Sequence, residues 1–151
     1  MKMRARLVLC VLTGCVAAGM ASAKNWKATE IDASVSNRAN TSTLVIECIS
    51  DGRIFMRVQF RAYTNIWFNE KAVARIGKQE FPLEIGIGSE HMYLHNLPKL
   101  GISPELIAAL KSGGTLMLEG KAVQRLPEAQ RSFPLDGGGK LIEEVVRGCG
   151  R

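Results

Sequence analysis

The positions of the cysteines constrain the fold of this chain more than any other feature. Two of the four, Cys10 and Cys15, lie in an apolar run at the start of the sequence, and the others are Cys48 and Cys149. Two cysteines in one domain of an exported protein predict one disulfide. It would close a loop of 101 residues, which corresponds to about 4 to 5 kcal/mol of lost unfolded-state entropy. A catalytic thiol is the alternative, but no C-x-x-C motif or neighbouring base accompanies either cysteine.

The start of the chain predicts export. Three basic residues precede the apolar run LVLCVLTGCVAAGMASA, which is shorter than a membrane-spanning helix and typical of a secretory signal. The small residues Ala21-Ser22-Ala23 form a cleavage pattern, so residues 1–23 are predicted to be a signal peptide and the protein to be periplasmic or secreted. The segment Leu12-Thr13-Gly14-Cys15 also resembles a lipobox, in which Cys15 would carry lipid. An outer-membrane lipoprotein is therefore the alternative location.

Removal of the signal leaves only a mild positive charge. The whole chain carries a formal net charge of +6, and three basic but no acidic residues lie in the first 23, so the remainder carries +3. The sequence contains no motif of a nucleic-acid-binding module, and export argues against such a partner. We therefore expect a protein partner, with membrane contact only if Cys15 is lipidated. The sequence leaves the oligomeric state open.

Alternating apolar residues predict strands along most of the mature chain. The strongest pair is Thr43–Ser50 and Arg53–Phe60, separated by Asp51-Gly52, which predicts a hairpin with a type I′ turn. Weaker strands are predicted at Ala72–Ile76, Phe81–Ile87, Met92–His95, Thr115–Glu119 and Phe133–Leu135. Several short strands with turn signals between them are typical of an antiparallel β-sandwich or barrel.

Two short helices complete the prediction. The first begins after an N-cap at Ser103, with Pro104 in its first turn, and ends before Gly113. The second covers Lys140–Arg147, with Asp136 as a candidate cap. The fold class is thus mainly β with two short helices and one disulfide. Residues 24–42 are predicted to be a polar N-terminal arm docked through Trp26, and residues 43–151 a single β-rich domain.

A family resemblance covers roughly Pro104 to Cys149. The segments LIAALKSGGTLMLEG and FPLDGGGKLIEEVV resemble the C-terminal half of small exported bacterial proteins of the invasion-associated locus B (IalB) type. The cysteine-ended terminus is also similar to that of VasI/TagO-like proteins associated with type VI secretion. This resemblance implies a periplasmic or surface β-sandwich accessory protein of the cell envelope, with a role in host interaction or secretion and no catalytic residues to transfer.

Motifs for catalysis, metals and cofactors are weak. His91 and His95 have helical metal-ligand spacing, but on the predicted strand residues four apart lie about 13 Å apart. Ser89-Glu90-His91 lacks the nucleophile elbow of a hydrolase. Gly137–Lys140 lacks the earlier glycine and the following Ser or Thr of a phosphate loop. We therefore predict no enzyme, no metal and no cofactor, with a hydrolase as the least favoured function.

An aromatic cluster gives the candidate binding residues. Tyr63, Trp67 and Phe68 lie close together in AYTNIWFN, and Arg57 and Arg61 precede them. Aromatic and arginine side chains supply much of the contact energy at protein interfaces. Core or edge packing is the structural alternative for the aromatic residues. The predicted function is an accessory binding protein, and the alternative is an inhibitor or immunity protein that binds a periplasmic enzyme.

Overall fold

The computed structural model describes residues 25–60, 71–87 and 91–149. Its strands are β1 Trp26–Ala28, β2 Asp32–Ser36, β3 Ser42–Cys48, β4 Ile54–Phe60, β5 Ala72–Ile76, β6 Gln79–Ile87, β7 His91–His95, β8 Thr115–Glu119 and β9 Ser132–Pro134. Its helices are η1 Pro98–Leu100, α1 Pro104–Lys111, α2 Glu128–Arg131 and α3 Gly139–Gly148. In these ranges the nine strands form one antiparallel sheet in the order β1-β2-β3-β4-β7-β6-β5-β8-β9. The predicted mainly β antiparallel fold is confirmed.

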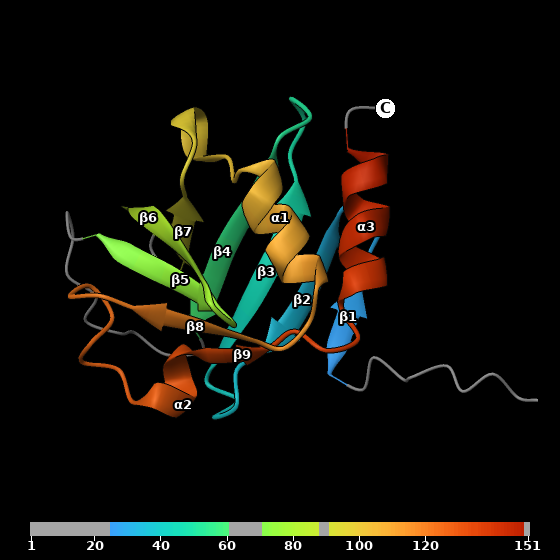
Figure 1. Ribbon diagram of the computed structural model, residues 1–151. Coiled ribbons are helices and arrows are strands. Elements are labelled where there is room, and N and C mark those ends of the chain that lie inside the picture. Colours follow the sequence, from blue (N-terminus) through green and yellow to red (C-terminus); the bar gives the residue numbers. More distant parts are fainter. Residues whose placement is uncertain (1–24, 61–70, 88–90, 150–151) are drawn as a thin grey trace, which may run out of the picture.

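The sheet folds over at β6. Residues 79–83 of β6 pair with β5, and residues 84–87 pair with β7. Strands β1 to β4 and β7 therefore form one layer, and β5, β8 and β9 form a second that crosses it (Figure 1). The free edge of β9 returns to the end of β2, where the amide of Arg38 donates to the carbonyl of Ser132 at 3.2 Å. The sheet thus closes part of the way towards a barrel.

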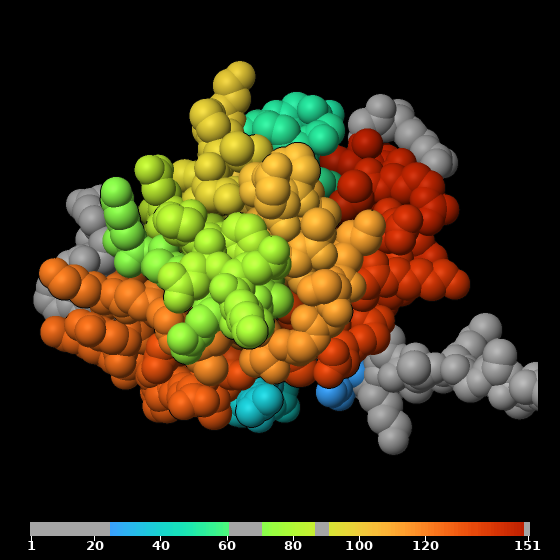
Figure 2. Space-filling view, in the orientation of Figure 1, coloured from blue at the N-terminus to red at the C-terminus, as the bar shows by residue number. Residues whose placement is uncertain are grey.

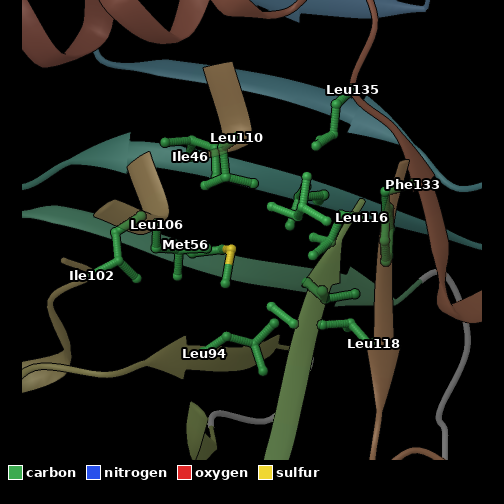
Figure 3. Packing of buried hydrophobic residues seen from close by; sticks show 14 of the residues in the cluster. Ile46, Met56, Leu94, Ile102, Leu106, Leu110, Leu116, Leu118, Phe133 and Leu135 are labelled. Carbon is green, nitrogen blue, oxygen red and sulfur yellow. The ribbon is translucent and has the colours of Figure 1, made fainter. Parts of the chain in front are cut away.

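The core fills the space between the two layers. Ile46 of β3 and Met56 of β4 are fully buried, because alternate residues of each strand face inward. Figure 3 shows Leu106 and Leu110 of α1 over these two side chains, with Phe133 of β9 at the side of the cluster. Burial of each large apolar side chain contributes about 1.5 to 3 kcal/mol. Helix α1 therefore forms part of the core.

The β3–β4 hairpin is confirmed, but its predicted type I′ turn is wrong. The turn runs from Ile49 to Gly52, whose amide donates to the carbonyl of Ile49 at 2.9 Å. Gly52 has a φ of 79°, whereas Asp51 is not among the residues with positive φ. A type I′ turn needs positive φ at both residues of the pair. The glycine is instead the last of the four turn residues, and the loop is longer than the predicted two residues.

Helices α1 and α3 match the two predicted helices. The hydroxyl of Ser103 accepts the amide of Leu106 at 3.3 Å, which confirms the predicted cap of α1. The prediction for Asp136 is wrong: its Oδ1 accepts the amide of Gly114 at 2.7 Å, and the N-cap of α3 is Gly138, with no side-chain cap. Asp136 therefore binds the segment that follows α1, because the end of α1 lies close to the start of α3.

The predicted N-terminal arm contains two strands of the sheet. Strand β2 pairs with β3 along five residues, and β1 pairs with β2. Trp26 is buried, as its predicted docking role requires, and it packs against Gly138 at the start of α3. Only Ala33 and Val35 of β2 face the core, between Asp32, Ser34 and Ser36. This short small-residue pattern gave no strand prediction.

The predicted disulfide is confirmed. Cys48 and Cys149 are joined, with their Cα atoms 5.4 Å apart. Cys48 ends β3 and Cys149 is the C-cap of α3, so the bond ties the last helix to the first layer of the sheet. Helix α3 also buries Ile142 and Val145 in the core. Such a bond is typical of a non-cytoplasmic location.

Candidate binding surface

The first layer carries a cluster of charged and aromatic side chains on the side opposite the core. We call this cluster the outer face; it consists of Glu47, Phe55, Arg57, His91 and Tyr93. These residues alternate with the inward residues of β3, β4 and β7, and the register sets Glu47 opposite Phe55 and Arg57 opposite Tyr93. Because three hydrogen-bonded strands carry them, the five side chains are held on a rigid base.

Arg57 is the centre of the polar contacts on the outer face. Its Nε donates to Glu47 Oε1 at 3.0 Å, and its Nη1 donates to Gln59 Oε1 at 3.4 Å. Its Nη1 also lies 3.1 Å from His91 Nδ1. Since a guanidinium only donates, His91 Nδ1 is the acceptor in this contact. Arg57 and Glu47 are both mostly buried, with side chains 18% and 21% exposed.

Aromatic contacts lie beside this polar group. The rings of Phe55 and Tyr93 pack edge to face, with centroids 6.3 Å apart. The guanidinium carbon of Arg53 lies 5.4 Å from the centroid of Phe55, within cation–π distance. His91 and Tyr93 are also neighbours, with centroids 6.3 Å apart. The outer face thus combines the arginine and aromatic side chains that are enriched at protein interfaces.

The structure bears on only part of the predicted binding set. Arg57 is described, whereas Arg61, Tyr63, Trp67 and Phe68 lie outside the described residues, in the segment that follows β4. The candidate lipidation residue Cys15 also lies outside them. Sequence reasoning missed the contribution of β3 and β7 to the surface around Arg57. The alternation of residues along β3 and β7 indicated which side chains share a face. The register of these strands with β4, which brings the side chains together, is visible only in the folded structure.

The other predicted motifs have ordinary roles where they are described. His91 bonds Arg57, whereas His95 Nδ1 donates to the carbonyl of Leu97 at 3.2 Å, so the two histidines have separate partners. Over residues 25–60, 71–87 and 91–149, no group of three His, Cys, Asp or Glu side chains is arranged to hold a metal ion. Ser89 and Glu90 lie outside the described residues. Of the glycines before Lys140, Gly138 is the N-cap of α3 and Gly139 is its first residue.

Comparison of the chain with protein-family models, curated proteins and solved structures gave no match. The resemblance to invasion-associated locus B proteins therefore stays a prediction. None of the helices in the described ranges has both the length and the apolar character of a membrane span.

Proposed function

We propose that this chain is an exported accessory protein of the bacterial cell envelope, periplasmic or secreted, which binds a protein partner and catalyses no reaction. The observation that carries the proposal is the outer face, where arginine and aromatic side chains lie on a rigid sheet. The disulfide supports the export part of the proposal, because such bonds persist in oxidising compartments.

The contacts within the outer face support a binding role in a specific way. Arg57 already has its charge balanced by Glu47, so a partner need not remove an isolated charge from water. Phe55 is 8% exposed, whereas Tyr93 is only partly buried and its ring packs edge to face with that of Phe55. A tyrosine held by a neighbouring aromatic ring loses little conformational entropy on binding. Tyr93 is therefore the residue on which we expect binding to depend most.

The test is capture of envelope proteins by the purified protein and by two matched variants. Tyr93→Ala removes the half-buried ring from the outer face. Arg75→Ala removes the arginine of the Arg75–Glu119 ion pair on the second layer and serves as the control. We expect the wild type and Arg75→Ala to capture the same partner and Tyr93→Ala to bind it at least about tenfold more weakly, as at a typical hot spot.

Thermal unfolding of each variant shows that loss of binding is not loss of fold. Equal capture by Tyr93→Ala and Arg75→Ala would contradict the outer face as the binding surface. The identity of the partner separates the two classes of function. A captured enzyme whose activity falls on addition of the protein would favour the inhibitor alternative over the accessory role.

A further inference from the structure

A second candidate site lies at the opposite end of β7 from His91. It is a surface pocket of about 510 Å³ between the β6–β7 pair and the loop that leads to α1. Its lining residues are Lys71, Pro82, Leu83, Glu84, His95, Asn96, Leu97, Pro98 and Lys99. This volume is within the range of small-molecule sites. None of these residues belongs to the outer face as defined above, but His95 follows Tyr93 on the same side of β7, so the pocket borders the proposed partner surface.

Three neighbouring charged or polar residues, from β6, from β7 and from the position just before β5, form one side of the pocket. Glu84 of β6 lies directly opposite His95 of β7. Lys71 comes one residue before β5, and Ala72 pairs with Leu83 of β6, so Lys71 lies next to Glu84 across the antiparallel pair. Residues in register on adjacent strands face the same side of a sheet. A cation, a carboxylate and an imidazole therefore stand in one row.

The loop from β7 to α1 forms the other side. This loop, yellow at the top of Figure 2, protrudes from the body of the molecule. Asn96 fixes its base, because Asn96 Oδ1 accepts the amide of Ser103 at 2.8 Å and Asn96 Nδ2 donates to the Ser103 hydroxyl at 3.1 Å. Arg53 Nη1 donates to the carbonyl of Lys99 near its tip. The wall of the pocket is thus held by contacts from two other elements.

The backbone of this wall is strained. Lys99 and Leu100 have φ angles of 58° and 65°, in the left-handed region that residues with a Cβ rarely adopt. Each such residue costs on the order of 1 to 2 kcal/mol. Strain of this kind is found preferentially at binding and catalytic sites, where the surrounding structure holds it. The strained pair places Lys99 at the rim of the pocket.

The charged side chains of the pocket form no ion pair with another side chain in the described part of the chain. Ion pairs in the described ranges join Arg53 to Asp51, Arg57 to Glu47, Arg75 to Glu119 and Lys111 to Glu143. Lys71, Glu84 and Lys99 are in none of these pairs. The pocket therefore offers two ammonium groups and one carboxylate to a ligand. Leu97, with 41% of its surface exposed, adds apolar contact area beside Pro82 and Pro98.

We propose that this pocket binds a small zwitterion with an apolar side chain, either a free amino acid or a dipeptide. The carboxylate of the ligand pairs with Lys71 and Lys99, its ammonium group pairs with Glu84, and its side chain packs on Leu97 and the two prolines. Opposite charges on the ligand match the mixed charges of the pocket, which a simple anion or cation would satisfy only in part.

The first experiment titrates the purified, oxidised protein with four probes by calorimetry. The probes are leucine, leucyl-leucine, N-acetylleucine, which lacks the ammonium group, and leucinamide, which lacks the carboxylate. We expect leucine or leucyl-leucine to bind at millimolar concentration, and the preferred one of the two identifies the ligand. Loss of one charge should weaken binding about threefold, the value for an exposed ion pair. Equal binding of all four probes, or no binding of either zwitterion, would overturn the proposal.

Three pocket variants and one control variant assign the binding to this pocket. Lys71→Gln and Lys99→Gln should each weaken binding of the preferred zwitterion about threefold, whereas Lys78→Gln, in the exposed β5–β6 turn, should leave it unchanged. Glu84→Gln should weaken binding of the zwitterion, because it removes the partner of the ligand's ammonium group. It should strengthen binding of N-acetylleucine, because it removes a carboxylate that repels the carboxylate of this probe. Equal effects of Lys71→Gln and Lys78→Gln would refute the site. These titrations contain no partner protein, so their failure would leave the proposed role of Tyr93 in partner capture to be tested by Tyr93→Ala alone.

Discussion

Gly138 is the residue at which the packing leaves the least room. A Cβ atom at this position would lie 2.2 Å from Cε2 of Trp26, far inside van der Waals contact. Trp26 is 7% exposed and joins β1 to the start of α3, so neither the indole nor the helix has space to shift freely. The glycine is therefore required by the close approach of Trp26.

The change Gly138→Ala should destabilise the protein by about 1 to 3 kcal/mol, because the new methyl group overpacks the Trp26 contact. Gly148→Ala, at the other end of α3, is the matched control, since a Cβ atom there would lie 3.8 Å from the carbonyl oxygen of Glu30, an ordinary van der Waals contact. There the better helix propensity of alanine should leave stability unchanged or raise it by up to about 1 kcal/mol. Urea unfolding measures both, and equal free energies of unfolding for the two variants would refute the packing argument.

Asp51 gives a prediction that titration can test. A side-chain hydrogen bond from Arg53 lowers the pKa of the Asp51 carboxyl below its ordinary value. A carboxyl whose pKa is lower in the folded state stabilises the fold above its unfolded pKa, and this contribution is lost as the pH falls through the folded pKa. NMR titration should therefore show that the pKa of Asp51 rises in Arg53→Gln and stays unchanged in Arg75→Gln. An unchanged pKa in Arg53→Gln would contradict the assigned cause.

At the level of elements, the sequence predicted those whose own residues carry the pattern. Strands β3 and β4 alternate large aliphatic residues around Asp51-Gly52, and α1 has both its cap and its stop signal. Strand β2 was missed because its small and polar residues are stabilised by pairing with β3 rather than by their own propensity. Helix α2 was also missed, since four residues are too few for a helical period.

The candidate sites were less predictable than the strands because they combine distant segments. Arg57 was identified, but its partner His91 belongs to β7, which pairs with β4 only in the folded sheet. The pocket likewise depends on the pairing of β6 with both β5 and β7. Single strands show which residues share a face, whereas the register that brings three strands together is a property of the tertiary fold.

Helix α3 is the element on which the disulfide should act most. Its C-cap is joined to β3 by the Cys48–Cys149 bond, while Ile142 and Val145 hold it to the core. The double change Cys48→Ser with Cys149→Ser should lower the free energy of unfolding by about 4 kcal/mol. Hydrogen exchange should then show α3 opening before β3 and β4. A loss below about 1 kcal/mol, or equal exchange in α3 and β4, would contradict this role of the bond.

At the scale of the whole molecule, one sheet, one core and one disulfide join the two ends of the described chain. Strand β1 and helix α3 meet at Trp26 and Gly138, and α3 is bonded to β3. The outer face and the pocket lie on this single frame. We therefore expect the chain to be exported and oxidised before it binds a partner.

Export and oxidation can be tested together by the intact mass of the protein from its native envelope, before and after reduction and thiol labelling. The account predicts the mass of Lys24 to Arg151, with two thiols that react only after reduction. A mass that begins at Cys15 with added acyl chains would keep export but replace the soluble form by the lipoprotein. A mass of the complete chain from Met1, or two thiols that react without reduction, would contradict the account.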